Sequence, residues 1–161
     1  MPPTLQRSWL ANSLDVNPQN AARYRASYAK LLELTRRLHA AGIPLVAGTD
    51  NIAGFTLHRE LELYVEAGLS PAEALQIATR NGAKYTQLSD LAGSVAVGKL
   101  ADLALVDRDP TLDISAVRDV SLVIRDGVVY YPSEVYAALG VEPFRPPPAV
   151  STPGRSGARA N

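Results

Sequence analysis

The sequence predicts an α/β protein, and three patterns along the chain carry this prediction. Residues 20–40 place apolar side chains at helical spacing, which indicates an amphipathic helix that ends near Gly42. The run 43–47 is short and continuously apolar, as in a parallel strand that is buried on both faces. Beyond residue 100, apolar runs of strand length flank the hairpin signal Asp126-Gly127. A helix, a buried strand and later short strands together favour an α/β fold with a β-rich C-terminal part.

The composition is that of a globular protein with no strong electrostatic preference. Hydrophobic residues make up 47% of the 161 residues and charged residues 20%, which argues against a disordered chain. Sixteen basic residues balance sixteen acidic ones, so neither a nucleic acid nor a membrane surface is an expected partner. The absence of cysteine excludes disulfides and thiolate metal sites. No apolar run reaches the length of a membrane span.

Asp50 follows the predicted buried strand directly and is the first candidate functional residue. Gly48 lets the backbone turn sharply after the strand, and Thr49 can form local hydrogen bonds. In barrels of parallel strands, chemistry lies at the C-terminal ends of the strands, which is where Asp50 falls. The alternative is that Asp50 only forms the turn into the next loop, because Asp is a common turn residue.

Two helices are expected after Asp50. The first spans 57–67 and ends at Gly68. Its carboxylates fall outside the apolar face and are expected to be solvated: Glu60, Glu62 and Glu66. The second begins at Ser70, which forms a capping box with Glu73, and it is expected to end at residues 81–82. A short further helical piece is expected around residues 83–88.

The last part of the chain changes to strand patterns. Strands are expected at 101–107, 120–125 and 128–131, and a short helix at 133–139. The remaining tail, 143–161, is rich in Pro, Gly, Ser and Arg and is expected to be extended or disordered.

The succession of residues 57–75, 77–83, 93–95 and 98–107 resembles the C-terminal part of the metal-dependent amidohydrolase superfamily. Within that superfamily, the chain is similar to the imidazolonepropionase-like and prolidase-like amidohydrolases, and the likeness runs from about Arg37 to about Val128.

This resemblance implies a fold and a domain organisation. The family has a TIM-like (β/α)8 barrel, and a complete barrel takes about 250 residues. Residues 1–89 are then expected to be the last helix–strand–helix units of the barrel. Residues 90–142 would supply the C-terminal strands of a small β-sandwich that both chain termini build, and 143–161 the disordered tail.

The resemblance also implies roles for individual residues. Asp50 corresponds to the Asp that the last barrel strand delivers, so it is expected to bind metal and to take the proton from the attacking water. His58 lies on the same strand-to-helix connection and is a candidate substrate contact, although it can equally serve as a polar residue at the helix start. His39 precedes the strand, at the opposite end of the barrel, and is expected to cap a helix or lie on the surface.

Most of the family's metal ligands have no counterpart in this chain. The family uses a His-x-His pair, a Lys or Glu on a middle strand and two further histidines, whereas this sequence has only His39 and His58. The divalent metal of the complete enzyme is expected to be zinc. A zinc site usually requires three protein ligands, so this chain alone is not expected to bind the metal tightly.

The chain is therefore expected to be the C-terminal segment of a cytoplasmic amidohydrolase, with any signal peptide lying in the missing N-terminal part. The complete enzyme would hydrolyse a C–N bond of a small amide or a dipeptide, and this segment would be inactive alone. The expected partner is a missing N-terminal chain, which would complete the site, or further copies of this chain, although a homo-oligomer would still lack the histidines. The alternative is a non-catalytic relic or a partner-binding domain that uses the open barrel edge.

Overall fold

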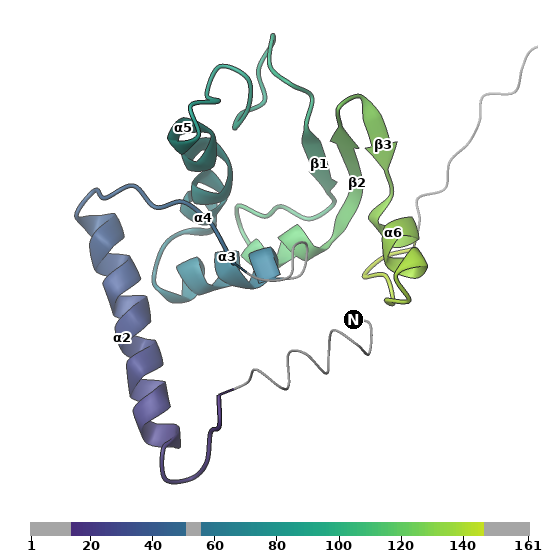
Figure 1. The fold of residues 1–161 in the computed structure, drawn as a ribbon. Coiled ribbons are helices and arrows are strands. Elements are labelled where there is room, and N and C mark those ends of the chain that lie inside the picture. Colours follow the sequence, from purple (N-terminus) through teal and green to yellow (C-terminus); the bar gives the residue numbers. More distant parts are fainter. Residues whose placement is uncertain (1–13, 51–55, 147–161) are drawn as a thin grey trace, which may run out of the picture.

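The computed structural model describes residues 14–50 and 56–146, which form a helical part followed by a small sheet (Figure 1). The helical part consists of α2 (Ala21–Ala40), α3 (Thr56–Glu66), α4 (Pro71–Gln76), the π-helix η1 (Ile77–Asn81) and α5 (Gly82–Tyr85). The sheet part consists of β1 (Leu103–Val106), the 3₁₀-helix η2 (Ile114–Arg118), β2 (Val120–Arg125), β3 (Val128–Tyr130) and α6 (Pro132–Ala138).

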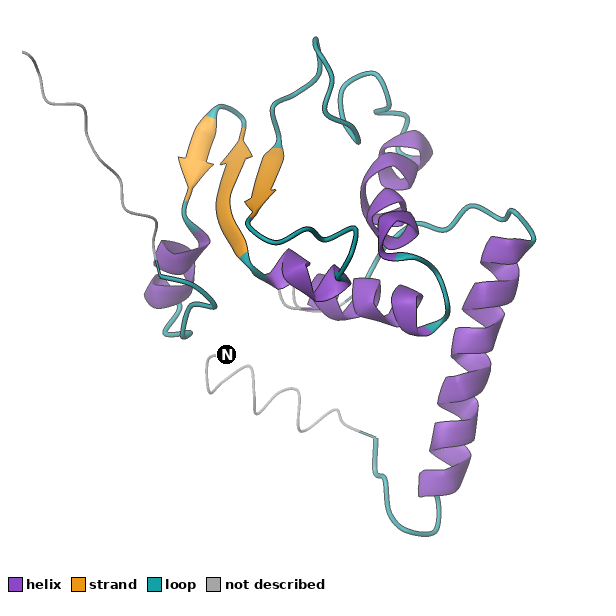
Figure 2. Ribbon diagram, turned by 180° about the vertical axis from the view of Figure 1, so that it is seen from behind, coloured by secondary structure: helices purple, strands orange, loops and turns teal. Residues whose placement is uncertain are grey.

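The three strands form one antiparallel sheet in the order β1-β2-β3, on the side of the molecule away from α2 (Figure 2). β1 pairs Leu103 with Ile124, and a register shift follows Leu105. β2 and β3 form the expected hairpin, in which Asp126 and Gly127 have φ values of 50° and 73°. Positive φ at both central residues is what a type I′ turn requires, so the Asp-Gly signal is confirmed.

Two small apolar clusters form the core, and the partly buried Tyr64 of α3 packs against both. One cluster joins α3 and α4 to η2 through four buried residues: Leu61, Ala74, Ile114 and Val117. The other cluster consists of Ala67, Leu69 and Ile77, and the partly buried Leu45 and Ala47 pack against it. The second cluster therefore attaches the segment that leads to Asp50 to the helical part.

Local signals set the boundaries of the helices around this core. The side chain of Ser70 accepts a hydrogen bond from the backbone N–H of Glu73, and the carboxylate of Glu73 accepts one from the backbone N–H of Ser70, so the capping box is confirmed. Gly68 ends α3 with φ 100°, a conformation that costs glycine little.

The expected end of the second helix at 81–82 is wrong. Gly82 has helical dihedral angles, φ −57° and ψ −49°, and the helix continues through it to Tyr85. A glycine ends a helix only when the chain adopts the left-handed conformation there, and Gly82 does not. The five-residue π-helix η1 precedes it, in the middle of this long helical stretch.

The expected buried strand at 43–47 is not formed as a strand. Leu45 and Ala47 are partly buried, but Ile43 and Val46 are 48% and 38% exposed. A parallel strand needs a neighbouring strand to receive its hydrogen bonds, and no described residue offers one. The segment is extended without a sheet. α2 has no buried residue, and its Leu31 and Leu34 are 63% and 52% exposed, although Leu32 packs against the second cluster.

The start of the expected disordered tail is ordered against the sheet part. Phe144 packs edge-to-face on Tyr136 with ring centroids 5.7 Å apart, and Arg145 forms an ion pair with Asp107. Residues 147–161 lie outside the described residues. The structure contains a single sheet among its described residues, so it does not test the second layer of the expected sandwich.

The core predicts a measurable cost for truncating Ile77, which is 2% exposed. We expect Ile77→Ala to lower the free energy of unfolding by about 2–5 kcal/mol, because it removes buried methyl groups and leaves a cavity. Urea denaturation followed by circular dichroism measures this change. Val97→Ala is the matched control, since Val97 is fully exposed and its truncation should change the unfolding midpoint little. Equal effects of the two substitutions would contradict the assignment of this core.

Candidate functional site

Asp50 lies at the end of the extended segment that connects α2 to α3. Its side chain is exposed, and its φ of 42° places it in the left-handed region. Asp and Asn tolerate this region better than most other residues with a side chain. Within 14–50 and 56–146, its carboxylate has no hydrogen-bond or ion-pair partner. The carboxylate is thus free to act on a group from outside this part of the chain.

Side chains from the helices hold the segment before Asp50. The backbone N–H of Gly48 donates to Glu60 Oε1 at 2.9 Å. The amide of Asn81 donates to the carbonyl oxygen of Leu45 at 2.9 Å. Tyr64 donates to the same Glu60 oxygen at 2.7 Å. Side chains on α3 and η1 therefore form hydrogen bonds with backbone groups of this segment that would pair with a neighbouring strand in a sheet.

Tyr64 is suited to act as a permanent donor in this arrangement. Burial raises the pKa of its hydroxyl, and the hydrogen bond to Glu60 raises that pKa further. The hydroxyl consequently keeps its proton throughout the physiological pH range. The carbonyl oxygen of Val46 lies 3.5 Å from it, at the limit of a hydrogen bond.

Asn81 is the last residue of η1, the only π-helix in the described ranges. Such π segments are rare, and they occur often at functional sites because the extra residue redirects the side chains around it. Here the redirected side chain reaches Leu45, thirty-six positions earlier in the sequence. Neither Asn81 nor Glu60 was expected to have such a role: Glu60 was expected to be solvated, and Asn81 to mark a helix end. The one available signal was the i, i+4 spacing of Glu60 and Tyr64.

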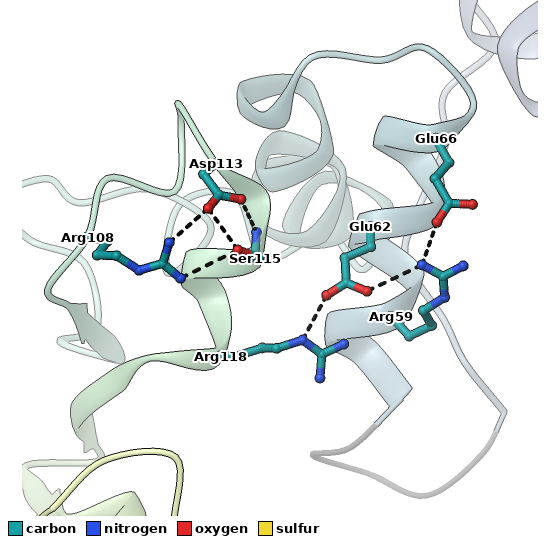
Figure 3. Close-up of polar contacts among 7 residues, drawn as sticks. All are labelled: Arg59, Glu62, Glu66, Arg108, Asp113, Ser115 and Arg118. Atoms are coloured by element: carbon teal, nitrogen blue, oxygen red, sulfur yellow. Dashed lines mark hydrogen bonds and ion pairs between the residues drawn. The ribbon is translucent and has the colours of Figure 1, made fainter.

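His58 lies on another side of α3, beside a group of charges. Burial lowers the pKa of its imidazole, the nearby guanidinium of Arg118 lowers it further, and Glu62 partly opposes them. Arg118 Nε forms an ion pair with Glu62 Oε1 at 2.7 Å, which ties η2 to α3 (Figure 3). Among the described residues, no hydrogen bond joins His58 to the Asp50 segment. The structure thus brings His58 to the contact between α3 and η2.

The described residues do not assemble a metal site. No group of three His, Asp or Glu side chains within them could hold an ion. His39 Nε2 lies 3.1 Å from Glu73 Oε1, and this pair joins the C-terminal end of α2 to α4. None of the described helices is both long enough and apolar enough to cross a membrane.

The environment of His58 predicts a pH dependence of stability. Because its pKa in the folded chain lies below the usual value near 6.5, the unfolded chain binds this proton more tightly. The stability should therefore be greatest above about pH 6.5 and should fall as the pH decreases toward the folded-state pKa. Urea unfolding at several pH values measures this slope. His58→Gln should reduce the slope, whereas His39→Gln should leave the His58 contribution in place. An unchanged slope in His58→Gln would contradict the assignment.

Comparison with known proteins places the chain in a family. The model of the amidohydrolase family matches residues 19–130. The chain is 40% identical over 80 residues to adenine deaminase 2 of Jannaschia sp. strain CCS1, which covers 49% of this chain and 13% of that protein. It is 31% identical over 110 residues to the imidazolonepropionase of Geobacillus kaustophilus strain HTA426, covering 59% of this chain and 26% of that protein.

A solved structure, that of a Xaa-Pro dipeptidase with bound methionine in its active site, superposes with a TM-score of 0.59 at 35% identity. The match covers 62% of this chain and 25% of the dipeptidase. The chain spans about a quarter or less of the length of each of these three relatives. Since the family model matches more than half of its residues, the chain belongs to the amidohydrolase family.

Proposed function

We propose that this chain supplies the C-terminal segment of a metal-dependent amidohydrolase that hydrolyses a C–N bond in a small molecule. Asp50 is the group that transfers the proton in this proposal. The observation that carries it is the placement of Asp50 at the exposed end of a segment that α3 and η1 hold by hydrogen bonds. A carboxylate on a fixed backbone can be held at the distance that proton transfer needs.

The chemistry proposed for Asp50 follows from its exposed carboxylate, which pairs with no other described residue. It accepts a proton from the water that attacks the carbon of the C–N bond, and it then donates that proton to the leaving nitrogen. The carbon gains the hydroxyl of the water, the nitrogen gains the proton, and the carboxylate is regenerated. General acid–base catalysis of this kind contributes about 10²- to 10⁴-fold to a rate.

A divalent metal does not fit the described residues of this chain alone. Asp50 offers one carboxylate, while a catalytic zinc usually takes three protein ligands. We propose that the remaining ligands come from a part of the enzyme outside these residues. A metal in such a site would lower the pKa of the attacking water.

The substrate class is proposed from the relatives. Their names point to adenine, an imidazolone ring and Xaa-Pro dipeptides, all of which contain a C–N bond that water can cleave. These three compounds form the first substrate panel for the complete enzyme. Ammonia release, ring opening and proline release are the respective readouts.

One observation favours a second candidate function, the binding of a partner strand by a non-catalytic chain. The backbone N–H groups of Leu45, Val46 and Ala47 donate to no other described residue. Unpaired backbone groups of this kind are readily used for strand addition. This function requires no further metal ligands, so the natural size of the polypeptide distinguishes it from the first proposal.

Replacing the carboxylate of Asp50 tests the catalytic role. We expect Asp50→Asn, in the natural polypeptide that contains this segment, to reduce kcat about 100-fold or more. Asn tolerates the left-handed φ of this position, so the substitution removes the charge and leaves the backbone undisturbed. Asp126→Asn is the matched control, because Asp126 has a similar φ of 50° at the tip of the β2–β3 hairpin. Full activity of Asp50→Asn would contradict the proposal.

The size of the natural polypeptide tests whether other ligands are available. An immunoblot of the source cells with an antibody against residues 57–75 should show a band well above the 17.2 kDa of this chain. A band at 17.2 kDa, with no separate subunit that supplies ligands, would favour the partner-binding function instead.

A further inference from the structure

We propose that Glu60 and Asn81 are positioning residues that fix the backbone of residues 45–48 and thereby the place of Asp50. Neither side chain touches the reacting atoms in this proposal. The structural half of the proposal, that these side chains fix the backbone, is argued from the contacts of this chain. The catalytic half, that they thereby position Asp50, rests on the function proposed for Asp50.

Among the described residues, no strand pairs with this segment. Side-chain contacts must therefore set the position of residues 43–47. The partly buried Leu45 and Ala47 attach the segment to the core, but apolar contacts are not directional and do not fix its register. Hydrogen bonds are directional and supply that restraint.

Glu60 provides the restraint nearest to Asp50. Its Oε1 accepts the N–H of Gly48 at 2.9 Å, only two residues before Asp50. The same oxygen accepts the hydroxyl of Tyr64 at 2.7 Å, one helical turn further along α3. Tyr64 is half-buried and keeps its proton, so it holds the carboxylate in one orientation. The acceptor for Gly48 is thus itself oriented.

Asn81 provides a second restraint from a different element. Its Nδ2 donates to the carbonyl oxygen of Leu45 at 2.9 Å, three residues before Gly48. Ile77 of η1 packs with Ala67 and Leu69, which follow α3, so the two elements that carry the anchors share one apolar cluster. Two anchors on one rigid support define both the position and the direction of the segment. A single anchor would leave it free to pivot.

Amide hydrogen exchange in the full chain tests the structural half. The Gly48 N–H should exchange about tenfold faster in Glu60→Ala, because its acceptor is lost. Glu60→Gln should restore slow exchange, since the Gln side chain also presents an acceptor oxygen at this place. Glu66→Ala is the matched control on the same helix, because Glu66 bonds Arg59 and Tyr28 and does not contact Gly48.

Asn81→Ala keeps the test decisive should Glu60→Ala fail to fold. It removes the second anchor, and the Gly48 N–H should again exchange faster while the unfolding midpoint shows that the chain is folded. Arg80→Ala, at an exposed neighbouring position, should not change the exchange. Unchanged exchange of Gly48 in both Glu60→Ala and Asn81→Ala, or in Asn81→Ala alone if Glu60→Ala does not fold, would overturn the proposal.

Kinetics in the natural polypeptide test the catalytic half. A displaced Asp50 should lower kcat about tenfold in Glu60→Ala with little change in KM, and Glu60→Gln should recover most of it. A loss that affects KM alone, or faster Gly48 exchange with unchanged kcat, would overturn the positioning role. Full activity of Asp50→Asn would instead contradict the proposed function and leave the exchange result standing, so the two failures are distinguishable.

Discussion

The hydrogen bond from the Gly48 N–H to Glu60 is the constraint on which the arrangement around Asp50 depends. An extended segment without a neighbouring strand has many conformations of similar energy, and apolar packing alone does not select one. A charge-assisted hydrogen bond contributes about 1.5–3 kcal/mol, enough to favour one conformation strongly. The second bond, from Asn81 to Leu45, then converts this single point of attachment into a defined direction.

The helical part that carries these anchors is itself tied to the sheet part. Leu61 of α3 and Val117 of η2 lie in one apolar cluster, and the ion pair of Glu62 with Arg118 crosses the same contact (Figure 3). Arg59 extends these charges along α3 to Glu66. A partly exposed ion pair stabilises little by itself, so the shared apolar cluster is the stronger link. The residues after 90 therefore support the helix that holds the Asp50 segment.

Features that depend on neighbouring residues could be predicted from the sequence, and features that depend on distant ones could not. The Ser70 capping box and the Asp126-Gly127 hairpin were correct because residues within a few positions determine them. The strand at 43–47 was wrong because a strand exists only beside another strand. Asp50 was predicted to be a site residue from its position after an apolar run and from the family resemblance, and that role stays a prediction. The contact of Glu60 with Gly48 is one that no local pattern encodes.

In the proposed complete amidohydrolase, the segment before Asp50 would pair with a strand from outside the described residues. α2 ends directly before the segment that leads to Asp50 (Figure 1), and within that segment the backbone N–H groups of residues 45–47 donate to no other described residue. The anchors from Glu60 and Asn81 engage only Gly48 and Leu45, so most of the remaining backbone groups stay available for a strand from elsewhere. The helices can thus hold the Asp50 segment in place before any such strand pairs with it. Assembly would then bring further metal ligands to the carboxylate of Asp50. It would not also have to order the backbone that carries this carboxylate.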